Sequence, residues 1–325
     1  MSADIRKRGI ELLAAGQAQA AVDLMVAGAK AGDAGALYEL ALWHVYGTPV
    51  ARDFTIARAL FERAGQAGHA EGAATHAVFV AMGAGGPADW PTARTLVEKA
   101  AQTDPDAARQ ATLIAAMDLK PDGTPAVLAP PEILSASPHV AVARALLTPD
   151  EGKHVAKLSQ PRLTPSVVVD PRTGRQSPHP IRTSEGTVLG PIQQDLVTHA
   201  LNLRFAAVTG TGVRQGEPLS VLRYAPGQQY RLHHDCLPGE PNQRILTLIA
   251  YLNDDYAGGA TGFPKNAIEF RGQAGDALIF ANTLPDGRAD ERNRHAGLPV
   301  TQGEKWVATR WIRARVFDPW GMYRG

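Results

Sequence analysis

The first 119 residues alternate between Ala-rich stretches with apolar residues at helical spacing and short breaks that contain Gly or Pro. Each unit has one such stretch, a break (GTPV at 47–50, GAGGP at 83–87) and a second stretch (ARALFERA at 57–64, ARTLVEKA at 93–100). When residues 31–64 are shifted forward by 36 positions, many residues coincide, including Gly47 with Gly83 and Asp53 with Asp89. The pattern predicts an internal repeat of helix pairs.

This repeat resembles the Sel1-like repeat, a relative of the tetratricopeptide repeats that forms an α-solenoid. The resemblance covers residues 31–100, with half a unit before it and a degenerate unit at 101–119, as expected of capping ends. It implies a region that binds another protein or another part of the same chain. The alternative is a helical appendage that only stabilises the second domain.

Beyond residue 119, Pro and Gly interrupt the helical pattern over 120–139, and we place the domain boundary there. The sequence predicts a helical domain at 1–120, a linker at 121–139 and a second domain at 140–325. In the second domain we expect helices at 140–157 and 191–207, and a strand followed by a turn at 166–176. Four longer strands are expected at 218–226, 244–253, 276–282 and 305–317. Short strands at this spacing favour a β-sandwich or jelly roll, so the fold class is α+β and multidomain.

Composition limits the binding partners and the cellular compartment that we expect for the protein. Lys and Arg (33) nearly balance Asp and Glu (32), which argues against a nucleic-acid or anionic membrane partner. The apolar N-terminal stretch is interrupted by polar residues at helical spacing, and no run approaches the roughly 20 apolar residues of a membrane span. The single cysteine, Cys236, cannot form an intramolecular disulfide. We therefore expect a cytoplasmic protein.

The segment YAPGQQYRLHHD at 224–235 carries the first candidate chemistry. Side chains alternate faces along a strand, so His233 and Asp235 share one face and His234 lies on the other. One imidazole and one carboxylate make up two thirds of a two-histidine, one-carboxylate iron site. His295, 60 residues after Asp235, is the best candidate for the third ligand.

The last long predicted strand carries a lysine that is relevant to the candidate metal site. In KWVATRWIR (305–313), Lys305 and Thr309 share one face with Val307 and Trp311. An ammonium group on a largely apolar face is costly unless an anion neutralises it. Beside a metal site, the carboxylate of a cosubstrate would supply that anion. The alternative for Lys305 is a solvated lysine on an edge strand.

Several blocks in fixed order resemble the prolyl 4-hydroxylase branch of the Fe(II)/2-oxoglutarate dioxygenases. They are YxPGQxYxxHxD (224–235), QRxLTLxxYLND (243–254), GGxTxFP (258–264), GDALIF (275–280) and HAGLPVxxGEKWVATRWIR (295–313), with DPRTG (170–174) and RTS (182–184) upstream. The resemblance spans about residues 130–318. It implies a double-stranded β-helix, a jelly-roll or cupin-like fold, with flanking helices.

The resemblance also implies roles for individual residues. His233, Asp235 and His295 would hold iron(II), and no further side chain need act as a catalytic base. Lys305 would pair with the distal carboxylate of 2-oxoglutarate, helped by Thr309 and by either Tyr224 or Tyr251. Three positions would line the substrate groove: Tyr230, Arg244 and Trp311. Arg313 departs from the pattern, because some plant-type and algal members have histidine there.

The activity implied is hydroxylation of a prolyl residue in a protein or peptide. O2 and 2-oxoglutarate would be consumed, succinate and CO2 released, and ascorbate would be the reductant. The Sel1-like repeats would help to recruit the substrate. Two alternatives stay open: the same chemistry on another side chain, a free amino acid or a small molecule, or a solenoid adaptor with an inactive oxygenase domain.

Overall fold

A computed structural model describes residues 2–169, 176–178 and 181–323. The chain divides into two compact units. The helical unit comprises residues 1–126, 191–200 and 318–325, and the β unit comprises residues 127–190 and 201–317. Within the described residues, no helix combines the length and the apolar character needed to cross a bilayer.

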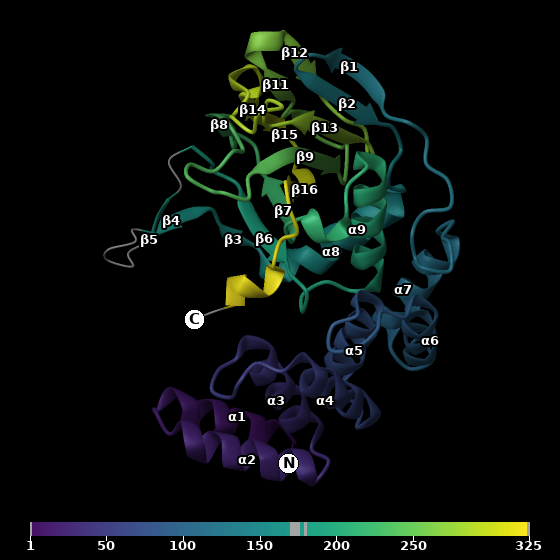
Figure 1. Cartoon of the computed structure of the whole chain (residues 1–325), viewed down its shortest axis with the longest axis vertical. Helices are drawn as coiled ribbons and strands as arrows, with labels where there is room; N and C mark the ends of the chain where they lie inside the picture. The colour runs from purple at the N-terminus through teal and green to yellow at the C-terminus, as the bar shows by residue number, and fades with distance from the viewer. Residues whose placement is uncertain (1, 170–175, 179–180, 324–325) are drawn as a thin grey trace. The chain divides into compact units, whose positions relative to one another are not determined.

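The helical unit is a run of antiparallel helices, each of which packs on its neighbours in the sequence (Figure 1). Its helices are α1 (Ser2–Ala14), α2 (Ala18–Lys30), α3 (Ala34–Tyr46), α4 (Phe54–Gln66), α5 (Ala70–Met82), α6 (Trp90–Ala100) and α7 (Pro105–Ala116). A short 3-10 helix, η5 (Pro319–Tyr323), also belongs to this unit.

The repeat predicted from the sequence is confirmed by the ends of these helices. Asp53 and Asp89, which coincide under the 36-residue shift, each cap the next helix by accepting a hydrogen bond from a backbone N–H three residues later. Gly47 and Gly83 end α3 and α5 in the left-handed conformation, with φ of 78° and 73°. Helices α3/α4 and α5/α6 are therefore equivalent pairs of an α-solenoid.

The β unit contains two antiparallel sheets. The larger has eight strands in the order β1-β2-β13-β9-β16-β7-β6-β3, and the smaller has four in the order β12-β11-β14-β8. The strands of the larger sheet are β1 (Glu132–Ala136), β2 (His139–Ala143), β3 (Thr164–Pro165), β6 (Glu185–Leu189), β7 (Leu219–Tyr224), β9 (Arg244–Tyr251), β13 (Ala277–Ala281) and β16 (Lys305–Arg313). Those of the smaller sheet are β8 (Tyr230–His233), β11 (Thr261–Phe263), β12 (Ile268–Phe270) and β14 (His295–Gly297).

Two further strand pairs and several helices complete this unit (Figure 1). β4 (Val167–Val169) pairs with β5 (Gln176–Pro178), and β10 (Ala257–Gly258) pairs with β15 (Val300–Gln302). The helices are α8 (Pro149–Ser159) and α9 (Leu196–Thr209), of which residues 201–209 belong to this unit. Asn202 of α9 accepts a hydrogen bond from the buried Arg310 of β16, at 2.6 Å.

Apolar side chains from both sheets form one core. Phe263 of β11 and Phe270 of β12 pack in the same buried cluster as Tyr251 of β9, Phe280 of β13 and Val307 of β16. The small sheet therefore covers one face of the large sheet, as expected of a double-stranded β-helix. The fold class predicted from the sequence is confirmed: a helical-repeat region followed by an antiparallel β domain with flanking helices.

The four longer strands predicted from the sequence are all present, but the stretch at 132–157 differs from expectation. Residues 132–136, expected to belong to the linker, form β1, and the helix expected at 140–157 is wrong in its first half. Val140 and Val142 are buried in strand β2, opposite Phe280 and Leu278 of β13. The alternation in HVAVA fits a strand, and pairing across more than 130 residues of sequence decides between strand and helix. Helix α8 begins only at Pro149, after a capping box formed by Thr148 and Glu151.

Candidate functional site

Strand pairing in the small sheet brings together the three residues proposed as metal ligands. β8 and β14 run antiparallel, with His233 directly opposite His295, and Asp235 follows the end of β8 by two residues. One ligand atom from each of the three residues lies within 4.8 Å of the others, and all three residues are buried. The site thus forms between two neighbouring strands that are far apart in the sequence.

Both histidines present the same nitrogen to the carboxylate. His233 Nδ1 lies 2.8 Å from the carbonyl oxygen of Arg231, and His295 Nδ1 lies 3.0 Å from that of Asn293. A carbonyl can only accept a hydrogen bond, so each Nδ1 carries a proton, and a neutral ring of this tautomer offers the lone pair of its Nε2 to a metal. Those Nε2 atoms lie 3.6 and 3.7 Å from the two oxygens of Asp235. Burial lowers the pKa of His295 to about 4, which keeps its ring neutral near pH 7.

The carboxylate of Asp235 is oriented by a chain of hydrogen bonds. The Thr247 hydroxyl donates to Asp235 Oδ2 at 2.6 Å, and the Asn282 amide donates to Thr247 Oγ1 at 2.8 Å. Burial alone would raise the pKa of Asp235, but His295, His233 and the Thr247 hydroxyl outweigh burial and hold this pKa well below its usual range. Asp235 is therefore an anion, as a metal ligand must be. Sequence reasoning gave Thr247 no role, because its only signal is a hydroxyl between Leu246 and Leu248 of β9.

His234 and Cys236, which lie next to Asp235 in the sequence, do not contribute to the cluster. His234 Nε2 lies 3.6 Å from Glu291 and outside the cluster. The Cys236 thiol contacts the carbonyl oxygen of Asn282 at 3.2 Å, and burial raises its pKa to about 11. His234 follows the last residue of β8 and lies apart from the cluster that contains His233.

A pocket opens from this cluster toward β16. Its lining includes the three proposed metal ligands, His233, Asp235 and His295. Five further residues with predicted roles also line it, together with Thr261: Tyr224, Tyr230, Lys305, Thr309 and Trp311. Lys305, Val307, Thr309 and Trp311 all line it, so these four side chains share one face of the last strand.

Lys305 is 4% exposed and lies at the inner end of this strand. Its ammonium group donates to the carbonyl oxygen of Gly259 at 2.6 Å and lies 5.7 and 5.3 Å from the ring centroids of Tyr224 and Tyr251. Among the residues that the structure describes, no carboxylate lies within ion-pair distance of it. Burial consequently lowers the pKa of Lys305 to about 7. A carboxylate-bearing ligand in the pocket would supply this cation with an anion.

The two tyrosines proposed for the cosubstrate occupy different positions. Tyr224 lines the pocket, whereas Tyr251 is fully buried and donates to or accepts from the Thr261 hydroxyl at 2.9 Å. Burial raises the pKa of both tyrosines, so both hydroxyls are neutral donors. Tyr230 stacks on the ring of His233, with centroids 3.5 Å apart and an interplanar angle of 13°.

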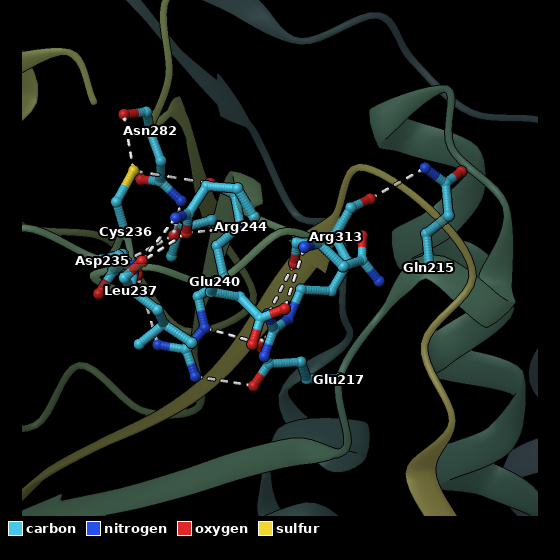
Figure 2. A network of polar contacts seen from close by, with 12 residues as sticks. Gln215, Glu217, Asp235, Cys236, Leu237, Glu240, Arg244, Asn282 and Arg313 are labelled. Carbon is cyan, nitrogen blue, oxygen red and sulfur yellow. Dashed lines mark hydrogen bonds and ion pairs between the residues drawn. The ribbon is translucent and has the colours of Figure 1, made fainter. Parts of the chain in front are cut away.

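Arg244 is not among the residues that line the pocket, and Figure 2 shows it in a network of polar contacts with Glu217. Its Nε and Nη2 donate to the two oxygens of Glu217 at 2.6 and 2.7 Å, and its guanidinium lies 4.0 Å from the ring centroid of Trp311. Glu217 also pairs with Arg313 at 2.5 Å, and Arg313 donates to the carbonyl oxygen of Asn242. Arg244 therefore supports Trp311 instead of facing the pocket. No sequence motif indicated Glu217, because its two partners lie on strands far along the chain.

The upstream motifs are described in part. DPRTG at 170–174 lies outside the described residues. In RTS, Arg182 lies 5.5 Å over the ring of Tyr230, and Ser184 hydrogen-bonds to Tyr224. This segment borders the pocket next to β8.

Two imidazoles and one carboxylate, buried together beside a lysine ammonium group, match the two-histidine, one-carboxylate metal site of the kind found in non-haem iron oxygenases. The comparisons agree. The family model described as the 2OG-Fe(II) oxygenase superfamily matches residues 219–313. Prolyl 4-hydroxylase 1 of Arabidopsis thaliana is 35% identical over 204 residues, covering 57% of this chain and 72% of that protein. The chain belongs to the 2OG-Fe(II) oxygenase superfamily and is a prolyl 4-hydroxylase-like member of it.

Solved structures match each region separately. The viral collagen prolyl hydroxylase of Paramecium Bursaria Chlorella virus-1 is 25% identical, with a TM-score of 0.45, over 54% of this chain and 96% of that one. A Sel1 repeat protein from Oxalobacter formigenes is 22% identical, with a TM-score of 0.31, over 34% of this chain and 87% of that one.

Proposed function

We propose that this protein hydroxylates a prolyl residue of a protein or peptide, with iron(II) as cofactor and 2-oxoglutarate and O2 as cosubstrates. The observation that carries the proposal is the arrangement of the buried His233, Asp235 and His295 in one pocket with the buried cation Lys305. The prolyl target rests on the 35% identity to a plant prolyl 4-hydroxylase.

The residues present fit iron(II). Two neutral Nε2 lone pairs and an ionised carboxylate form one face of donors, and each is held by a bond on its far side. When bound, iron(II) and 2-oxoglutarate would supply the oxidising chemistry, in which O2 converts 2-oxoglutarate to succinate and CO2 while a substrate C–H becomes C–OH. The protein's part is to position these groups and to exclude water.

Lys305 and its neighbours suit the distal carboxylate of 2-oxoglutarate. The ammonium group would pair with this carboxylate, the Thr309 hydroxyl shares the same strand face, and Tyr224 also lines the pocket. Tyr251 would act through Lys305, because its ring covers the lysine and its hydroxyl is hydrogen-bonded to Thr261. An anion beside Lys305 would raise its depressed pKa, so binding of 2-oxoglutarate would draw a proton onto the protein near neutral pH.

Substrate would enter past Tyr230 and Trp311. The indole N–H of Trp311 is buried without a hydrogen-bond partner among the described residues, and its ring lines the pocket. A peptide carbonyl would satisfy this donor. Arg244, paired with Glu217, would hold the indole from behind. The helical repeats would add a second contact to a protein substrate.

The test is turnover with iron(II), 2-oxoglutarate and ascorbate, the last included as the reductant that keeps iron ferrous. Succinate and a 16-dalton mass gain are measured with proline-containing peptides and with the same peptides carrying alanine at proline. We expect succinate and the mass gain only with proline present. The inactive control is His233→Ala and its matched control is His234→Ala. Stimulation only by compounds without proline would exclude the prolyl target, and no iron binding or succinate at all would exclude the oxygenase.

A further inference from the structure

The last turn of the chain packs into the helical unit through one aromatic side chain. Trp320 of η5 lies against Phe54 at a centroid distance of 4.5 Å and meets Phe79 edge-on at 5.5 Å. Phe79 is fully buried in the core of the helical repeats, and Phe54 and Trp320 pack on that core from its surface. The indole thus packs against one aromatic ring of α4 and one of α5.

A single arginine fixes the backbone of this segment. Arg52 Nη2 donates to the carbonyl oxygen of Trp320 at 3.1 Å. The same guanidinium donates to the carbonyl oxygens of Val45 and Tyr46, at 2.8 and 3.4 Å, in the last turn of α3. Arg52 therefore joins the end of a repeat helix to a segment 268 residues away in the sequence. This charge-assisted contact is directional, so it fixes the position of the segment's backbone.

The segment is shaped to present its indole. The carboxylate of Asp318 accepts a hydrogen bond from the backbone N–H of Trp320 at 3.1 Å, and Gly321 N–H bonds to the carbonyl oxygen of Asp318 at 3.3 Å. These two bonds close a turn over Asp-Pro-Trp-Gly. The tryptophan at this turn contributes both the ring and the carbonyl oxygen that contact the helices.

The repeat itself does not require this pocket. In the next unit, 36 positions on, Arg52 corresponds to Ala88 and Phe54 to Trp90, whose side chain is buried and packs against Gly123. The arginine is thus specific to the first full repeat, although α4 and α6 begin with equivalent aspartate caps. Because Ala88 stands at the equivalent position of the α5/α6 pair, a helix pair of this repeat folds without an arginine there.

We propose that Arg52, Phe54 and Phe79 form a peptide-binding pocket of the helical repeats, and that its occupant is the chain's own C-terminal segment, Asp318–Tyr323. The segment acts as a tethered ligand that can detach while the helices stay folded. Tethering gives it an effective concentration in the millimolar range, so a separate copy of the same segment competes poorly for the pocket. Removal of the tethered indole opens the pocket to that copy.

The test uses the full-length chain and a fluorescent peptide with the sequence of residues 314–325, ARVFDPWGMYRG. Binding is followed by fluorescence anisotropy. We expect saturable binding to Trp320→Ala and binding at least about tenfold weaker to the wild type, because the tethered indole competes. Trp306→Ala is the matched control: it removes a tryptophan from the β unit and should behave as the wild type. The peptide with alanine in place of tryptophan should not bind any of these proteins.

The location of the site is checked with Trp320→Ala combined with Arg52→Ala, which should lose most of the peptide binding gained. If circular dichroism shows that Trp320→Ala is unfolded, Trp320→Phe keeps a ring in the pocket and should bind the peptide more tightly than the wild type does. Peptide binding that is equal in the wild type and the folded Trp320 variant would overturn the proposal. So would binding that survives the loss of Arg52 unchanged.

Discussion

Lys305 offers a prediction in which stability and ligand binding change in opposite directions. Its ammonium group is buried, and its pKa falls from 10.5 to about 7 because of that burial. Each pKa unit corresponds to about 1.4 kcal/mol, so the cost of holding this cation in the ligand-free protein approaches about 5 kcal/mol. Lys305→Met keeps most of the side-chain volume and removes the charge. Ligand-free Lys305→Met should therefore be more stable than the wild type.

The sign of the pH dependence follows from the same shift. Below pH 7 the lysine is protonated in both the folded and the unfolded chain, so the whole cost is present. Between pH 7 and 10.5 the unfolded chain still holds the proton that the folded chain has released, and the free energy of unfolding of the wild type rises with pH. The advantage of Lys305→Met should thus be largest at pH 6 and should shrink above pH 7.

The assay is thermal and urea unfolding of the ligand-free proteins at pH 6, 7 and 9. At about 2–4 °C per kcal/mol for a domain of this size, Lys305→Met should melt several degrees higher than the wild type at pH 6. Lys153→Met, at a lysine whose side chain is 75% exposed in the same unit, should change the free energy of unfolding by no more than about 0.5 kcal/mol. With the metal present, 2-oxoglutarate should raise the melting temperature of the wild type far more than that of Lys305→Met. If Lys305→Met were less stable at pH 6, or its effect did not vary with pH, the reasoning from desolvation would be refuted.

Three further predictions concern the polar contacts around the pocket. Asp235→Asn should abolish tight iron(II) binding while His234→Ala preserves it, measured by metal titration under anaerobic conditions; equal loss in both would contradict the separation of the two faces. Thr247→Val should weaken metal affinity about 10–100-fold by freeing the Asp235 carboxylate, with an unchanged melting temperature of the metal-free protein as the control. Glu217→Gln should lower the free energy of unfolding by about 3–5 kcal/mol, because it leaves two arginines, with side chains only 15% and 7% exposed, without their shared anion; a loss below about 1 kcal/mol in urea would argue against a strong ion-pair network.

The sequence predicts most clearly the features that depend on local spacing. Helical repeats recur at a fixed interval, so the equivalent caps Asp53 and Asp89 align from the sequence alone. The period of two along a strand likewise predicts that Lys305 and Thr309 share one face, and both line the same pocket.

Features that depend on which strands pair could not be predicted in this way. Spacing alone does not show that β2 pairs with β13, and residues 140–143 were therefore assigned to a helix. The contact of Thr247 with Asp235, and that of Glu217 with Arg313, join elements whose proximity is decided by the sheet. The same limit explains Arg244, which a sequence motif places in the substrate groove but which an unforeseen carboxylate turns toward the back of Trp311.

The direct opposition of His233 and His295 has a consequence for how the protein is assembled. β8 is the last strand of the small sheet, and among the described strands of that sheet its one neighbour is β14. A metal ion held by both histidines would link β8 to β14 reversibly, in addition to the backbone hydrogen bonds that join Arg231 and Gln229 to residues 181–183 on the other side of β8. The stability of this edge of the small sheet would then depend on the concentration of available iron.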